Sequence, residues 1–242
     1  MSVSKRVTAA GSAVAMMLAL APQAGAGSPG DDATAKLEAW SASPEAAARI
    51  AVLRDAGLTD EQVVTVIEDP LSAAGSSTTF ETSDNVTVGP TGSTDSVPVG
   101  NGLFATPTAE AEATAAAGAT CGWAITNHDG SAFAVRTARL TLRTDWCWKG
   151  GSIDGTPVAS HRSSLTSYGD AAGWRVGGSY AGSTGWLGTG HKRYRTEAKA
   201  DWTLQFCVPP VGPCQQVGSG TAWARHEVTG SGTVAKDQGG WP

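Results

Sequence analysis

The chain has 242 residues, of which 40% are hydrophobic and 16% charged, so it is long enough and apolar enough to bury a core. This composition excludes a wholly disordered protein. The formal charge of −5 divides unevenly: it is +2 over residues 1–26, −11 over 27–117 and +4 over 118–242. Of the 16 Phe, Trp and Tyr residues, 13 follow residue 117, so the sequence predicts two parts of different character.

Residues 1–26 have the pattern of a secretory signal peptide. Lys5 and Arg6 precede an uncharged run over 8–21, and Ala24-Gly25-Ala26 provides a small-residue cleavage site. The run is too short for the ~20 residues of a membrane-spanning helix. We therefore expect a secreted, extracellular protein without a transmembrane span after cleavage, and the Ala- and Gly-rich signal is typical of bacteria.

Residues 27–70 are predicted to form an acidic helical prosegment. Ala33, Leu37 and Trp40 share one helical face. A second helix should begin at Ser43-Pro44 and stop near Gly57, and Thr59, with Gln62 three residues later, has the pattern of a capping box. Few large apolar residues are available, so these helices would be marginal alone. Their acidity predicts docking against a basic face of the later domain.

Residues 71–118 are rich in Ser, Thr, Gly, Pro and Ala, and their few large apolar residues are scattered. This composition predicts an extended linker between the helical prosegment and the domain that follows.

Residues 119–242 predict an antiparallel β domain. Residues 138–148 and 193–206 alternate between apolar and polar side chains, which is typical of half-buried strands. Hairpin turns are predicted at Asp129-Gly130, Gly150-Gly151 and Asp154-Gly155. The fold class is therefore a short helical segment followed by an all-β sandwich or barrel.

Four cysteines in an exported chain predict two disulfides, for which three pairings are possible. Cys207 and Cys214 flank the turn-forming residues Val-Pro-Pro-Val-Gly-Pro, so we favour this pair, and Cys121–Cys147 follows by elimination. No metal-ligand spacing and no phosphate-binding loop occur in the sequence, so neither a metal nor a cofactor is predicted.

The strongest sequence signal for a binding site is aromatic. Trp174, Tyr180 and Trp186 recur every six residues in a Gly-rich segment, and a continuous strand would place all three on one face. Aromatic rings of this kind stack on sugars. The alternative is that they fill the core of the sandwich and cover glycines on the facing strand. Arg193 and Arg195, beside His191, add a basic face that would attract anionic ligands. The primary hypothesis is a binding or antagonistic module for a surface glycan or an anionic cell-envelope polymer; nucleic acid is not the expected partner.

Two alternatives belong to other functional classes. A secreted hydrolase could pair His161 or His191 with a carboxylate, or could use two of the strand carboxylates, which are Asp145, Glu197, Asp201 and Glu227. Ion pairs with basic neighbours are a simpler explanation for these carboxylates. A structural protein could instead assemble with partners by strand addition.

Overall fold

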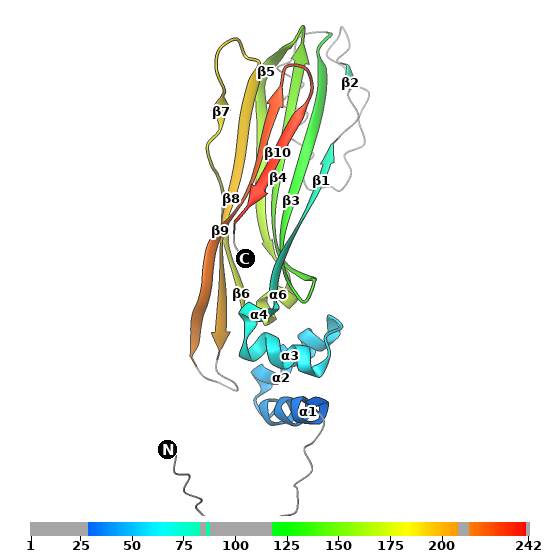
Figure 1. The fold of residues 1–242 in the computed structure, drawn as a ribbon, viewed down its shortest axis with the longest axis vertical. Coiled ribbons are helices and arrows are strands. Elements are labelled where there is room, and N and C mark those ends of the chain that lie inside the picture. Colours follow the sequence, from blue (N-terminus) through cyan, green and yellow to red (C-terminus); the bar gives the residue numbers. More distant parts are fainter. Residues whose placement is uncertain (1–28, 83–85, 88–117, 208–212, 241–242) are drawn as a thin grey trace, which may run out of the picture.

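The computed structural model describes residues 29–82, 86–87, 118–207 and 213–240 as an elongated β-sandwich with helices at one end (Figure 1). Two antiparallel sheets, each of five strands, run along the long axis. The predicted signal peptide, residues 1–26, lies outside the described residues. Among the helices that the structure describes, none combines the length and hydropathy required for a membrane span.

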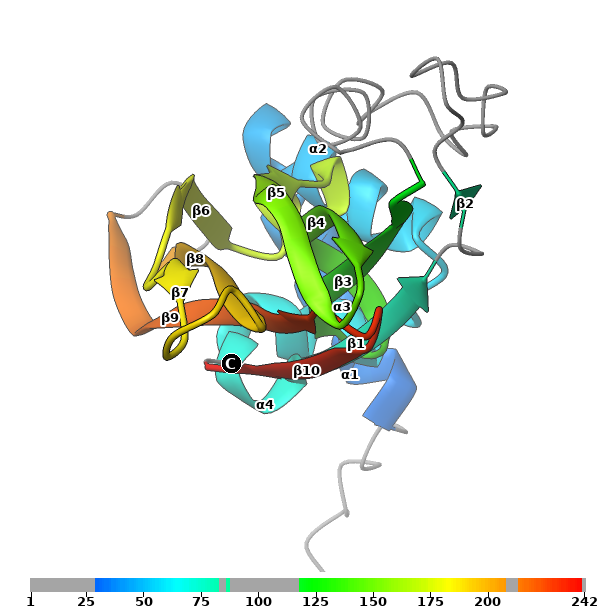
Figure 2. The same ribbon diagram turned by 90° about the horizontal axis from the view of Figure 1, so that it is seen from above.

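The first sheet, sheet A, has the strand order β1-β3-β4-β5, and β2 pairs with β3 beside β1. Its strands are β1 (Ala74–Thr82), β2 (Val86–Thr87), β3 (Thr120–Ala132), β4 (Val135–Lys149) and β5 (Ser152–Leu165). The second, sheet B, has the order β10-β9-β8-β6, with β7 paired to β8. It contains β6 (Trp174–Ala181), β7 (Gly185–Trp186), β8 (Arg193–Cys207), β9 (Cys214–Thr229) and β10 (Val234–Gly239). Figure 2 shows the two sheets from one end.

The predicted hairpin turns are only partly correct. Gly150 and Gly151, both with positive φ, form the turn between β4 and β5 as expected. Asp129-Gly130 instead lies inside β3, because Gly130 leaves room for two tryptophan rings: a Cβ there would lie 2.8 Å from Trp174. The actual β3–β4 turn falls at Phe133-Ala134, where both residues have positive φ.

Asp154-Gly155, the third predicted turn, lies inside β5. The pairing register with β4 shifts there, from Val158 opposite Asp145 to Asp154 opposite Cys147. Gly155 has φ +74°, so it supplies the backbone conformation of a bulge rather than of a hairpin.

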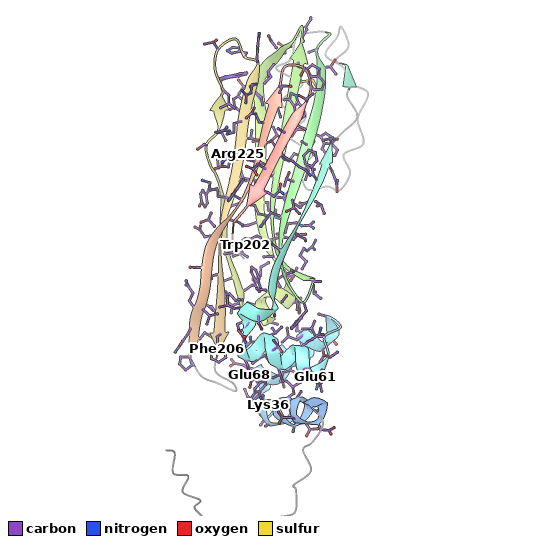
Figure 3. All side chains as sticks on the ribbon, in the orientation of Figure 1. Lys36, Glu61, Glu68, Trp202, Phe206 and Arg225 are labelled. Carbon is purple, nitrogen blue, oxygen red and sulfur yellow. A yellow bond between two sulfur atoms is a disulfide. The ribbon has the colours of Figure 1, made fainter. Side chains whose placement is uncertain are left out.

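The interior of the sandwich follows from the alternation in β8. Ala198, Ala200, Trp202 and Leu204 are fully buried and face sheet A, whereas the residues between them point outward. Trp202 lies between the sheets (Figure 3) and packs edge-to-face on Trp174, with ring centroids 5.7 Å apart. Small alanines on the central strands thus leave space for a few large indoles.

A buried polar network links the two sheets nearer the end opposite the helices. His226 of β9 is fully buried, and its Nε2 lies 2.8 Å from the Thr126 hydroxyl of β3. Its Nδ1 lies 2.9 Å from the Thr144 hydroxyl, which also contacts Thr196 at 2.6 Å. Burial lowers the pKa of His226 to about 4, so the imidazole is neutral at neutral pH.

The helical segment consists of α1 (Pro29–Trp40), α2 (Pro44–Asp55), α3 (Asp60–Glu68) and α4 (Pro70–Ala73). The predicted capping box at Thr59 and Gln62 is confirmed, with both of its hydrogen bonds formed. Gly57, with φ +89°, follows the C-terminal end of α2 as predicted. A short helix of the β domain, α6 (Ser167–Ala171), lies between the helical segment and the sheets.

The helices pack on the end of the sandwich and share its core. Leu37, Ile50 and Leu53 belong to the same buried apolar cluster as Leu140 and Trp202. The acidic segment therefore docks through apolar side chains, and not on the basic face that its charge predicted, because the arginines of that face already have carboxylate partners within the β domain.

The N-terminal part of the predicted linker is also structured. Residues 70–73 form α4, and β1 pairs along its whole length with β3, from Ala74 opposite Ala132 to Thr82 opposite Ala124. The small polar side chains of Ser76 to Thr79 suit an edge strand, and Phe80 turns inward to contact His226, with ring centroids 6.0 Å apart. The polar composition of β1 therefore does not indicate a linker.

Both favoured disulfides are present. Cys121 and Cys147 are directly opposite on β3 and β4, and Cys207 and Cys214 are directly opposite on β8 and β9. Disulfides form and persist in oxidising compartments, so this pairing points to a protein that folds outside the reducing cytoplasm.

Candidate functional site

The three aromatic residues predicted to line one groove lie in different places. Trp174 is fully buried opposite Leu204, whereas Tyr180 is opposite Lys199 on the outer face of sheet B. The β6–β8 register shifts between Val176 and Ser179, so one extra residue of β6 reverses the direction of the side chains that follow. The expectation of one shared face is therefore wrong.

Trp186 belongs to a third location, near the start of β8. Its ring stacks on His191 with centroids 4.3 Å apart and meets Tyr194 edge-on at 5.0 Å. Trp186 is half-buried and packs against the apolar cluster that contains Trp146 and Val228. Trp186 thus contributes to the packing of this end of the sandwich, away from Tyr180, and the exposed His191 covers its ring.

The predicted basic face is partly neutralised by ion pairs. Arg193 binds the Glu227 carboxylate through Nε at 2.6 Å and also through Nη2. Arg195, opposite Glu227 in the register, lies 3.7 Å from the same carboxylate. These contacts confirm the ion-pair interpretation of Glu227. The two guanidiniums share one carboxylate, so an anionic ligand would have to compete with Glu227 for them.

The outer face of sheet B instead presents a row of side chains across three strands. Tyr180 of β6 is opposite Lys199 of β8, and Lys199 is opposite Trp223 of β9. Neighbouring strands are about 4.8 Å apart, so the two aromatic positions are separated by about 10 Å. With 41% of its surface accessible, Tyr180 is the only aromatic among the exposed large apolar side chains of the described residues.

Trp223 is held in place by its neighbours. It is opposite Gly239 of β10, where an added Cβ would lie 3.0 Å from the indole ring. The Arg225 guanidinium lies 5.1 Å from the ring centroid. The glycine thus leaves space for the indole beside β10, and Trp223 is half-buried next to Lys199 in the pairing register.

Glu197 is a buried carboxylate that lies beneath this face and pairs with two of its cations. Only 2% of its side chain is exposed, and it receives hydrogen bonds from Lys199 at 2.9 Å and from Arg225 Nε at 2.7 Å. Burial alone would raise the pKa of Glu197, but the hydrogen bonds and charges of Lys199 and Arg225 outweigh it and lower the pKa. Glu197 therefore fixes both cations beside the aromatic pair.

Asp201 adds hydrogen-bonding capacity at the other side of the row. Its Oδ1 accepts a hydrogen bond from Thr221 at 2.8 Å and a longer one, 3.4 Å, from the Tyr180 hydroxyl. Asp201 is exposed, so its second oxygen can face a ligand. We call Tyr180, Lys199, Asp201, Trp223 and Arg225 the sheet B face; Arg225 is labelled in Figure 3.

The hydrolase alternative finds no support in the histidines. Within the described residues, none of the four forms a hydrogen bond or an ion pair with a carboxylate. His128, just before the predicted Asp129-Gly130 turn, is buried inside β3, where burial lowers its pKa. The His191 carbonyl accepts a hydrogen bond from the Ile153 amide at the start of β5. His161 lies farther along that strand: Ile153 and His161 are opposite Trp148 and Leu142, which are six residues apart on β4, so they are separated by about 20 Å.

The strand carboxylates are likewise engaged in ion pairs or hydrogen bonds. Asp145 is 1% exposed and bound by Arg143 at 2.8 Å on sheet A, far from the carboxylates of sheet B. Over the described residues, no group of three or more His, Cys, Asp or Glu side chains could hold a metal ion.

Sequence reasoning did not identify Trp223, although a signal for it was present. In the segment Ala222-Trp223-Ala224, the small residues fit the tightly packed interior, so the tryptophan between them must point outward. An outward tryptophan on a strand with Arg225 and Glu227 marks an unusual polar face.

Comparison of the chain with protein-family models, with curated proteins and with solved structures finds no match.

Proposed function

We propose that this chain is an exported binding protein that holds a surface glycan on the sheet B face. The observation that carries the proposal is the row Tyr180–Lys199–Trp223, which places an exposed and a partly accessible aromatic ring on the outer face of sheet B with a polar group between them. Sugar rings stack their apolar faces on aromatic side chains, while their hydroxyls exchange hydrogen bonds with charged and polar groups.

The charges of the face favour a neutral glycan over an anionic cell-envelope polymer. Lys199 and Arg225 are both bound to Glu197, and Arg193 and Arg195 share Glu227. A polyanion would have to compete with these carboxylates, whereas sugar hydroxyls can accept from the remaining N–H groups without displacing them. The signal-like residues 1–26 and the two disulfides support export.

Binding to insoluble glycans tests this proposal. Purified protein is incubated with peptidoglycan, chitin and cellulose, and the bound fraction is compared for wild type, Tyr180→Ala and Trp223→Ala. We expect each substitution to weaken binding by about tenfold, since a stacked aromatic contributes about 1–2 kcal/mol. Trp186→Ala, which removes an aromatic outside the sheet B face, is the control and should bind as wild type does.

Two results would reject the proposal. One is the absence of binding to any glycan by correctly folded wild-type protein, and the other is equal loss in Trp186→Ala and Tyr180→Ala. Loss of binding in Trp186→Ala alone would place the site near Trp186 and His191, at the start of β8, instead of on the sheet B face.

A further inference from the structure

A separate cavity lies where the helical segment meets the β domain. It has a volume of about 530 Å³ and lies between α2, α6 and the start of β6, beside Cys207. Its charged lining residues are Glu45, Arg49, Asp170 and Arg175. The volume is in the range of small-molecule sites and much exceeds that of a water molecule.

The Arg49 guanidinium in this cavity has unused hydrogen-bonding capacity. Its Nε donates to the Ala171 carbonyl at 2.5 Å, but its Nη2, which solvent does not reach, has no hydrogen-bond partner among the described residues. Among the residues that the structure describes, no carboxylate forms an ion pair with it. A guanidinium offers five N–H donors, and leaving a buried one without a partner is costly.

Arg175 brings a second guanidinium to the same cavity. Its Nη1 binds Asp170 at 2.7 Å and the Trp174 carbonyl at 2.6 Å. Burial lowers the pKa of Arg49, the positive charge of Arg175 lowers it further, and Asp170 opposes both. The two cations therefore repel each other, and the one carboxylate that opposes the repulsion is 65% exposed.

We propose that this cavity binds a small phosphomonoester, with its phosphate between Arg49 and Arg175. A phosphate offers three oxygens and up to two negative charges, so it can accept from both guanidiniums and cancel their repulsion. The remaining cavity volume accommodates the alcohol portion of such a molecule. Glu45, which lines the cavity without an ion pair to either arginine, opposes anion binding and so sets its strength.

Calorimetric titration of the purified protein at constant ionic strength tests the proposal. The probes are inorganic phosphate, glycerol 3-phosphate, acetate and glycerol. We expect single-site binding of both phosphates, with glycerol 3-phosphate the tighter, and no measurable binding of glycerol. Arg49→Gln should weaken glycerol 3-phosphate binding by about tenfold or more, and Glu45→Gln should strengthen it.

Arg54→Gln is the matched control, since Arg54 is on the same helix but pairs with Asp60 outside the cavity. It should change the affinity by less than about twofold, as expected for a distant surface charge. If Arg49→Gln does not fold, as judged by circular dichroism, Arg175→Gln replaces it. The proposal is overturned if neither phosphate binds, if acetate binds as tightly as phosphate, or if the cavity variants bind as the control does.

Discussion

Acid should destabilise this protein through His226, and the size of the effect follows from its surroundings. The imidazole is fully buried between the sheets, and burial lowers its pKa from 6.5 to about 4. In the unfolded chain the same group titrates at its ordinary value, so between these pH values the unfolded state binds more protons. The contribution of neutral His226 to the free energy of unfolding is therefore fully present above pH ~6.5, and it is lost as the pH decreases toward ~4.

The full loss is the pKa difference multiplied by about 1.4 kcal/mol per unit, or about 3.5 kcal/mol, of which about 3 kcal/mol is lost by pH ~4. Urea unfolding followed by tryptophan fluorescence at pH 7.5 and 4.5 measures the free energy of unfolding. Other titrating groups contribute to the pH dependence of the wild type, so the informative quantity is the difference between wild type and His226→Gln. We expect His226→Gln to be less stable at pH 7.5 but to lose about 2–3 kcal/mol less on acidification.

His161→Gln provides the control, because His161 is half-buried on an edge strand and has no hydrogen bond to another side chain in the described structure. Its pH dependence should match that of the wild type. If wild type and His226→Gln lose the same free energy between pH 7.5 and 4.5, the assignment of a neutral, buried His226 is refuted.

Three further outcomes concern stability. Gly130→Val should destabilise the protein by about 1–3 kcal/mol in urea unfolding, because the new side chain would meet Trp174, while Gly130→Ala should cost less. Leu53→Ala should lower stability by about 2–4 kcal/mol and keep a single transition; a separate early transition would show that the helices unfold independently. Replacing Cys121 and Cys147 by Ser should cost about 3–4 kcal/mol, since the disulfide closes a loop with a sequence separation of 26; an unchanged urea midpoint would contradict this.

The sequence predicts the sandwich, its helices and both disulfides because these features depend on local patterns. Alternation over residues 193–206 corresponds directly to β8, and the capping box at Thr59 forms as expected. Turns are harder to predict, because an Asp-Gly pair occurs both in hairpin turns and inside strands where the glycine makes room for a neighbouring side chain. At Gly130 the deciding factor is Trp174, which is 44 residues away in the chain and cannot be read from the local sequence.

In the candidate site, too, the local sequence indicates a single residue, whereas its neighbours come from distant parts of the chain. Tyr180 was identified from its aromatic spacing, but its true neighbours, Lys199 and Trp223, come from two other strands. A one-residue bulge in β6 separates Tyr180 from Trp174, and nothing in the sequence locates that bulge apart from Gly177-Gly178. Register therefore determines which aromatics share a face, and only the paired strands define it.

The acidic N-terminal segment contributes more to the structure than a releasable prosegment would. Its helices bury Leu37 and Leu53 in the core of the sandwich, and β1 extends sheet A and brings Phe80 against His226. Releasing residues 29–82 would expose this apolar surface and the edge of β3, which is a site for unwanted strand pairing. We therefore expect the segment to remain with the β domain in the folded protein, so that ligands meet the sheet B face and the Arg49 cavity on one molecule.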